Sequence, residues 1–204
     1  MGWVDLWRGI LVCDVFLDNK QLRYTPLPPP VVPKPLKGSP LLIRDIMVAG
    51  GYIKFFDMHS YVKVDFNSYD EYIYTPDGWD AVTGKMDLSK LDSEWEDDCK
   101  INISEVPSND LVLPIPLEDE DKNLILMRLY TSSPVLSLHD DGVVYIMYKL
   151  QPHDDSSWVI AVDMRQQSVN DVAYFGSGRP VSHDIFTYLQ SRISKHLGIG
   201  YTNM

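Results

Sequence analysis

Residues 44–58 read RDIMVAGGYIKFFDM, and this stretch decides the fold class. Two apolar runs, 44–49 and 52–58, flank the dipeptide Gly50-Gly51. Both runs are short and alternate with a period of two, which is typical of strands, whereas an amphipathic helix repeats every 3.6 residues. Paired glycines supply the positive φ angles of a tight turn. The stretch therefore predicts an antiparallel β-hairpin.

The same pattern continues along the chain. Towards the C-terminus four apolar runs follow one another, and the turn His139-Asp140-Asp141-Gly142 separates the first two. Four consecutive strands predict a meander. Its strands are expected at 135–138, 143–150, 158–164 and 172–175. Further strands are expected at 3–15 (one strand, or two around Arg8-Gly9), 21–27, 61–66, 79–88 and 99–106.

Three kinds of segment interrupt the strand pattern. The proline-rich stretch 26–40 predicts an extended connector over 31–40, because proline cannot donate to a β-ladder. The acidic stretches 91–98 and 118–121 predict solvated loops. Residues 183–197 predict a helix, because Ser182 can cap its start and apolar residues then recur along one face.

Three segments end an apolar run in an aspartate: ILVCDV with Asp14, VTGKMDL with Asp87 and WVIAVDM with Asp163. The aspartates are almost evenly spaced, and another predicted strand follows each. Such repeats are typical of stacked four-stranded sheets, as in β-propeller blades. We expect an all-β domain of antiparallel meanders in a propeller-like, incomplete stack with units at 1–30, 41–106 and 124–176 and a C-terminal helix. A β-sandwich-like domain is the alternative.

Net charge and cysteine content restrict the classes of partner. Asp and Glu total 29 against 18 Lys and Arg, a net charge of −11, which disfavours nucleic acid as a partner. Cys13 and Cys99 are too few for a disulfide framework, which indicates a reducing compartment. No uncharged run approaches the ~20 residues of a membrane span. We expect a cytoplasmic protein, and association with an organelle stays open.

Several longer motifs carry a family resemblance. They are GWVDLWRGILVCDV (2–15), LRYTPLPPP (22–30), RDIMVAGGYIKFFDM (44–58), LSLHDDGVVYIMYKL (136–150) and WVIAVDMR (158–165). Through them the chain resembles the plant family of domains of unknown function numbered sixteen-eighteen, abundant in cereal grasses. Members usually carry further sequence before GWVDLWRG, so this chain looks like a short form. The family has no established activity, and its links to stress responses and hybrid fertility imply an interaction or antagonist role.

The N-terminal motif supplies the candidate partner-binding residues Trp3, Asp5, Trp7 and Arg8. In a strand, Trp3, Asp5 and Trp7 point to one face. A preceding unit would cover that face in a complete propeller. We therefore expect an exposed aromatic patch and an unpaired strand edge. The alternative is that the C-terminal helix or the proline-rich connector covers both tryptophans.

The other candidate site is the pair of His-carboxylate turns, His139-Asp140-Asp141 and His153-Asp154-Asp155. If the two turns meet at one end of the meander, the alternative function is a ligand-binding or metal-binding protein, or an enzyme. However, no zinc-ligand spacing, nucleophile elbow or P-loop is present. We therefore predict a non-enzymatic protein–protein interaction module without cofactor or metal. Its partner would be a second copy, a longer relative that it neutralises, or an unrelated target.

Overall fold

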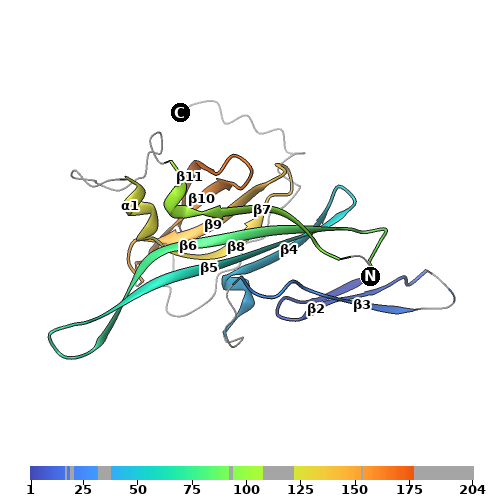
Figure 1. Ribbon diagram of the computed structural model, residues 1–204, viewed down its shortest axis with the longest axis horizontal. Coiled ribbons are helices and arrows are strands. Elements are labelled where there is room, and N and C mark those ends of the chain that lie inside the picture. The colour runs from blue at the N-terminus through green and yellow to red at the C-terminus, as the bar shows by residue number, and fades with distance from the viewer. Residues whose placement is uncertain are drawn as a thin grey trace.

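The computed structural model contains three antiparallel sheets, each built from strands that are consecutive in the sequence (Figure 1). It describes residues 1–16, 18, 21–31, 38–91, 94–107, 122–152 and 154–176. Sheet A contains β1 (Gly2–Asp5), β2 (Gly9–Cys13) and β3 (Leu22–Pro26). Sheet B contains β4 (Arg44–Ala49), β5 (Tyr52–Phe66), β6 (Tyr72–Asp87) and β7 (Glu96–Asn102). Sheet C contains β8 (Tyr130–Leu136), β9 (Val143–Lys149), β10 (Ser156–Asp163) and β11 (Ser168–Gly176).

The predicted class, all-β with antiparallel meanders, is confirmed. The hairpin at 44–58 forms as β4 and β5, and Gly50 and Gly51 take φ angles of 60° and 81° in the turn between them. The described helices are short: η1 (Pro40–Leu42), η2 (Ile103–Glu105) and α1 (Lys122–Met127). The sequence pattern did not predict helix α1. The helix predicted at 183–197 lies outside the described residues.

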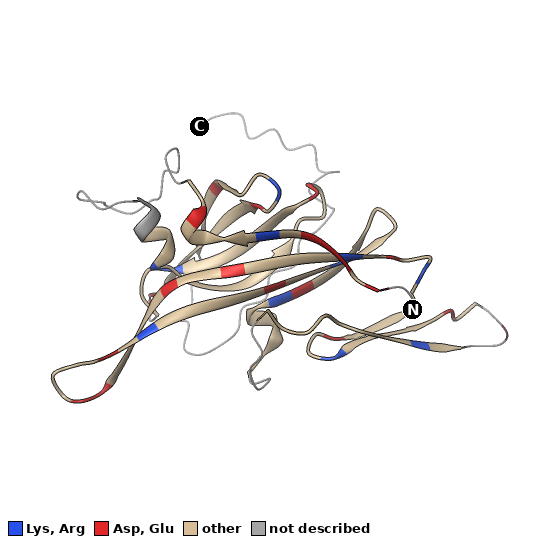
Figure 2. Cartoon of the chain, in the orientation of Figure 1, with Lys and Arg blue, Asp and Glu red and all other residues tan. Residues whose placement is uncertain are grey.

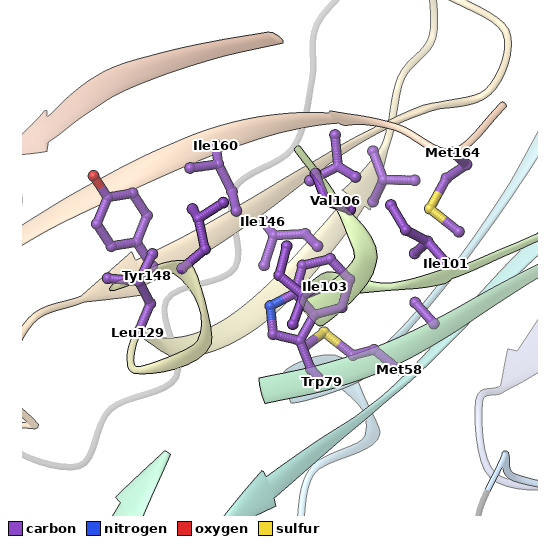
Figure 3. Close-up of a cluster of buried hydrophobic side chains, with 14 of the residues drawn as sticks. Met58, Trp79, Ile101, Ile103, Val106, Leu129, Ile146, Tyr148, Ile160 and Met164 are labelled. Carbon is purple, nitrogen blue, oxygen red and sulfur yellow. The ribbon is translucent and has the colours of Figure 1, made fainter. Parts of the chain in front are cut away.

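The larger core lies between sheets B and C (Figure 3). Alternate residues of each strand point to the same face, so one face of sheet B meets one face of sheet C. Sheet B contributes Phe56, Met58, Trp79, Ala81 and Ile101, and sheet C contributes Val144, Ile146, Tyr148, Ile160 and Val162. Helix α1 adds Ile125 and Leu126.

The opposite face of sheet B holds a second, smaller core against sheet A. It contains Ile10, Leu27, Ile53, Phe55 and Met86, with Val12, Ile46, Leu91 and Trp95 packed around it. Sheet B therefore buries both faces, and the layers are stacked in the order A, B, C. In this order the first strand of sheet B, β4, packs against the first strand of sheet C, β8.

The hairpin of β5 and β6 extends beyond its sheet (Figure 1). Strands expected at 52–58 and 61–66 join into the single strand β5, and the register shifts between Ser60 and Val62. We call residues 61–75 the arm. Its exposed apolar side chains include Val62, Val64, Phe66, Tyr72 and Tyr74. Figure 2 shows acidic positions near its tip and along β7.

Two local predictions are wrong. Strand β1 ends at Asp5, so Trp7 lies in a turn and not in a strand with Trp3. The acidic stretch 91–98 is not loop throughout, because β7 begins at Glu96 and pairs with β6. Pairing satisfies the backbone of 96–98 while its carboxylates find cationic partners or solvent.

Candidate interaction face

The turn between β1 and β2 is held by Asp5. Its Oδ1 accepts a hydrogen bond from the Trp7 backbone N–H (2.9 Å), and its Oδ2 pairs with Arg8 Nη1 (3.3 Å). The Arg8 backbone N–H donates to the Asp5 carbonyl oxygen (3.0 Å). Because an aspartate that binds the backbone two residues on stabilises a turn, β1 stops here. Asp5 and Arg8 therefore shape the motif, and their ion pair is exposed.

A buried ion pair lies beneath this turn. Arg44 and Asp57 are opposite each other on β4 and β5, with Nε–Oδ1 at 3.0 Å and Nη2–Oδ2 at 3.2 Å. The remaining nitrogen, Nη1, donates to the Leu6 carbonyl oxygen (2.9 Å). Asp57 Oδ2 also accepts from the Val31 N–H (2.8 Å). The pair therefore fixes the N-terminal motif and the start of the proline-rich stretch onto sheet B.

Trp7 belongs to this anchor. Its ring lies 5.3 Å from the Arg44 guanidinium, within the range of a cation–π contact, and its Nε1 donates to the Gly38 carbonyl oxygen (3.4 Å). The side chain is half-buried. The expectation that Trp7 forms part of an exposed aromatic patch is therefore wrong, because Arg44 and the end of the connector cover it.

Trp3 has the opposite environment. It faces away from sheet B and is 51% exposed. The register places Trp3, Leu11 and Tyr24 side by side across β1, β2 and β3, and Tyr24 is 59% exposed. Leu22, 64% exposed, lies beside them on β3. We call Trp3, Leu11, Leu22 and Tyr24 the outer face.

Strand β1 is also an edge of sheet A. The Met1 amine and the Cys13 N–H each bond the other residue's carbonyl oxygen, at 2.7 and 2.8 Å. Hydrogen-bonded and non-bonded pairs alternate in an antiparallel ladder, so the peptide groups of Gly2 and Val4 point away from β2. Within the described part of the chain no strand pairs with them.

Sequence reasoning identified Trp3 but missed its neighbours on the outer face. Leu11, Leu22 and Tyr24 were predicted to be in strands, but only the register between strands shows which of them lie beside Trp3. Arg44 and Asp57 were also missed, although a charged residue within each apolar strand was a signal that a buried partner was needed.

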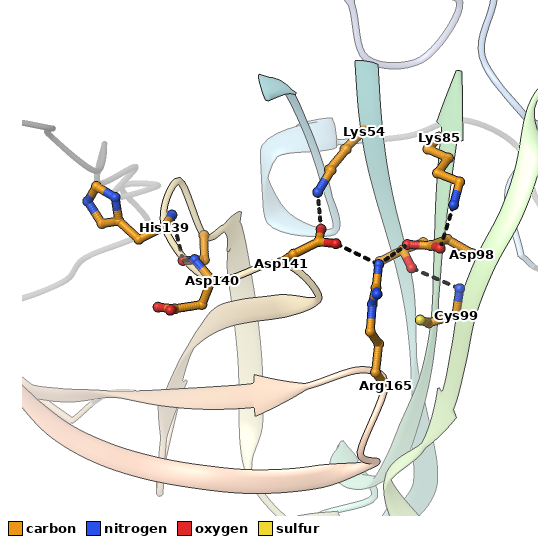
Figure 4. A network of polar contacts seen from close by, with 10 residues as sticks. Lys54, Lys85, Asp98, Cys99, His139, Asp140, Asp141 and Arg165 are labelled. Carbon is orange, nitrogen blue, oxygen red and sulfur yellow. Dashed lines mark hydrogen bonds and ion pairs between the residues drawn. The ribbon is translucent and has the colours of Figure 1, made fainter. Parts of the chain in front are cut away.

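In the described residues, the backbone of the His139 turn is held by Ser137. The His139 and Asp140 N–H groups both donate to Ser137 Oγ, at 3.2 and 3.0 Å. Figure 4 shows the His139 ring pointing away from the neighbouring Asp141 carboxylate. His153 lies outside the described residues, so the predicted meeting of the two turns stays a prediction.

Asp141 instead joins an ion network between sheets B and C (Figure 4). It pairs with Lys54 and with Arg165 Nη2 (2.7 Å), which also lies 3.5 Å from Asp98 Oδ2. Lys85 pairs with Asp98 Oδ1 (3.2 Å). The Lys54 hydrogen bond lowers the pKa of Asp141, and the Asp98 hydrogen bond raises the pKa of Lys85. These charges stabilise one another and bridge two sheets.

Cys99, next to this network, is not an activated thiol. Burial is the main cause that raises the pKa of its thiol, and the Asp98 charge adds to the effect. Nucleophilic cysteines need the pKa lowered, so Cys99 stays protonated near neutral pH. Among residues that the structure describes, no group of three or more His, Cys, Asp or Glu side chains is placed to hold a metal ion.

Comparison with known proteins gives one finding. A family model described as "Protein of unknown function (DUF1618)" matches residues 3–145 of the 204. No curated protein and no solved structure matches the chain. In the described part of the chain, none of the helices has the length and apolar character needed to cross a bilayer.

Proposed function

This chain belongs to the family described as "Protein of unknown function (DUF1618)", and because that description assigns no chemistry, we propose a function from its surfaces. The protein is a non-enzymatic module that binds another protein through the outer face of sheet A. The supporting observation is the apolar row Trp3–Leu11–Tyr24, in which the two aromatic side chains are exposed and Leu11 lies half-buried between them. Clusters of exposed aromatic residues are more typical of protein-binding surfaces than of strands that face only solvent.

The stacking of the sheets supports this assignment. Sheet B buries one face against sheet A and the other against sheet C. The outer face of sheet A would continue the same series, because another sheet could stack on it as sheet A stacks on sheet B. We propose that the architecture is a propeller-like, open stack and that a partner protein occupies the next position.

The partner is a second copy, a longer relative or an unrelated target, and the protein acts on it as a binding or neutralising factor in the cytoplasm. From the plant family that the sequence resembles, we place this role in stress responses or hybrid fertility of cereals. Nucleic acid is disfavoured as the partner because the chain carries a net charge of −11.

Tagged purification from cereal reproductive tissue, followed by mass spectrometry, tests the proposal. Trp3→Ser combined with Tyr24→Ser should release a stoichiometric partner that the wild type retains. Phe66→Ser combined with Tyr72→Ser is the matched control, because these residues are 59% and 63% exposed but belong to the arm, which projects away from sheet A (Figure 1). Recovery of a folded monomer alone, or equal loss with both double variants, would refute the proposal.

A further inference from the structure

The three aspartates of the sequence repeat occupy equivalent structural positions. Asp14 follows β2, while Asp87 and Asp163 end β6 and β10. In each case Oδ1 accepts a hydrogen bond from the backbone N–H two residues on, at 3.0 Å for Asp14, 2.8 Å for Asp87 and 2.9 Å for Asp163. Strands β6 and β10 are the third strands of sheets B and C. Asp5 makes the same bond at the end of β1, so it is the repeated sequence before Asp14 that assigns β2 as a third strand.

This correspondence identifies a strand that sheet A lacks within the described part of the chain. If β2 is a third strand, β1 and β3 are the second and the fourth. The described residues hold no strand in sheet A equivalent to β4 or β8. The missing position is next to β1, the edge at which the peptide groups of Gly2 and Val4 point outward.

The neighbouring sheets show how a first strand sits in this fold. β4 packs against β8, and Asp45 Oδ2 of β4 accepts a hydrogen bond from the Leu136 N–H of β8 (2.8 Å). Ile46 and Val48 point to the other face of β4, towards sheet A. Val48 is 54% exposed there. A first strand in sheet A would cover Val48, so its exposure is consistent with the absence of that strand.

A groove lies beside the missing position, beneath sheet A. Its volume is about 970 Å³, and it runs between the inner face of sheet A and β4. Its walls are largely apolar and include Val4, Ile10, Val12, Ile46, Val48 and Ile53. The unpaired edge and the apolar groove therefore meet at β1, and together they offer backbone hydrogen bonds and side-chain pockets to one extended segment.

We propose that sheet A is completed by a β-strand donated by a second polypeptide, which pairs with β1 and inserts alternate apolar side chains into the groove. This inference goes beyond the proposed function, because its contact is the edge of β1 with the groove and not the outer face. The donated strand runs antiparallel to β1, as β4 does to β5. The peptide groups of Gly2 and Val4 form the backbone hydrogen bonds with the donated strand. Alternate side chains of that strand contact Val48 on the face of sheet A that is turned towards sheet B.

The donor's chemistry follows from the same surfaces. Its groove-facing residues are aliphatic or Met, as in β4, whose sequence is RDIMVA. Its solvent-facing residues are neutral or basic, because the acceptor carries a net charge of −11. A second copy of the same acidic chain is disfavoured for this reason.

A synthetic peptide with the sequence of residues 42–50 serves as the probe, since it contains the first strand of sheet B. It is titrated into the full chain, and hydrogen exchange of the Val4 amide is followed by NMR. We expect saturable binding and slower exchange at Val4 by about tenfold or more. A peptide of the same composition without the apolar alternation should not bind.

Two pairs of variants locate the contact. Val48→Asp puts a charge on the groove wall and should weaken peptide binding by about tenfold or more, whereas Val62→Asp, at an equally exposed strand position of the arm, should not. Val4→Pro removes the outward N–H and should abolish binding, whereas Val4→Ala retains it. Thermal melts verify that each variant folds.

The outcomes separate this inference from the proposed function. Failure of the peptide to bind the wild type, or equal binding to Val48→Asp, overturns strand donation. If a tissue partner is nevertheless captured and depends on Trp3 and Tyr24, the proposed function stands without it. If the peptide binds as expected but no partner depends on the outer face, strand donation stands and the outer face is not the contact.

Discussion

At the scale of single residues, Gly9 in β2 is constrained by the strand beside it. A Cβ on Gly9 would lie 2.5 Å from the Thr25 carbonyl oxygen and 2.7 Å from the Tyr24 ring. The backbone oxygen cannot move aside without disturbing the β2–β3 pairing. Glycine is therefore required for the close approach of β3 to the N-terminal motif, which the motif's sequence alone does not indicate.

Gly9→Ala should lower the free energy of unfolding by about 1–3 kcal/mol, because the added methyl group overpacks this contact. Gly2→Ala is the matched control, since its Cβ would find only the Leu11 carbonyl oxygen at 3.8 Å. Urea unfolding of both variants checks the prediction. Equal stabilities for the two variants would contradict it.

Tyr148 is buried in the larger core, and its hydroxyl has no hydrogen-bond partner among the residues that the structure describes. Burial raises the pKa of this hydroxyl, so it stays protonated. Tyr148→Phe should raise the free energy of unfolding by about 1–3 kcal/mol, because it removes an unsatisfied buried polar group. Tyr24→Phe should instead lower it slightly, since the Tyr24 hydroxyl donates to the Arg8 carbonyl oxygen (2.9 Å). Thermal and urea unfolding should therefore show shifts of opposite sign.

At the scale of elements, the pairing of β4 with β5 determines how the N-terminal motif is held. The Arg44–Asp57 pair is fully buried and binds backbone groups of two other segments. Such a pair fixes position more than it adds stability, because desolvation offsets much of its Coulomb attraction. Its position explains how residues 2–15 are held against residues 44–58.

Asp57→Asn should destabilise the protein by about 3–5 kcal/mol, because it leaves the Arg44 charge buried without a counter-ion. Asp5→Asn, in the exposed pair with Arg8, should cost about 1 kcal/mol or less. The double variant Arg44→Met, Asp57→Leu should cost less than Asp57→Asn alone. Denaturant unfolding measures all three, and a double variant worse than Asp57→Asn would contradict this account.

The elements also show what sequence could and could not predict. Hairpin β4–β5 and the meander of sheet C follow from glycine turns and apolar alternation, both of which are local signals. The end of β1 at Asp5 was missed because Asp5 bonds the Trp7 N–H, a contact that competes with strand continuation. The outer face was predicted only at Trp3, because its other members are set by strand register and not by neighbours in sequence.

At the scale of the whole molecule, ion pairs supplement the apolar contact between sheets B and C. Lys54, Lys85 and Asp98 belong to sheet B, whereas Asp141 and Arg165 lie in turns of sheet C. Asp141 is half-exposed, so solvent screens much of its attraction. The network therefore adds polar contacts between the two sheets, while the buried apolar core provides most of the stabilisation.

The lowered pKa of Asp141 gives this contact a defined pH dependence. Its carboxyl has a lower pKa in the folded protein than its ordinary value of 3.8, so its stabilisation is present above that value. The stabilisation is lost as the pH falls through the lowered folded pKa. Asp141→Asn should therefore cost about 1 kcal/mol at pH 7 and nothing at strongly acidic pH.

Urea unfolding between pH 7 and strongly acidic pH measures the difference in the free energy of unfolding between wild type and Asp141→Asn. Asp140→Asn is the control, since the Asp140 carboxylate forms no ion pair in the part of the chain that the structure describes. High salt should reduce the Asp141 effect at pH 7. A cost that does not change with pH would indicate that Asp141 acts through packing and not through its charge.

Each sheet is built from consecutive strands, and this order along the chain decides when the faces of sheets A and B can come into contact during synthesis. Sheet A leaves the ribosome before β5 and β6, the strands whose Ile53, Phe55 and Met86 cover its inner face. Domains generally fold from the N-terminus as the chain emerges. Ile10 and Leu27 therefore stay exposed to solvent until β5 and β6 have been translated. A nascent chain halted before residue 52 would expose both faces of sheet A at once, and it should be the species that chaperones bind most strongly.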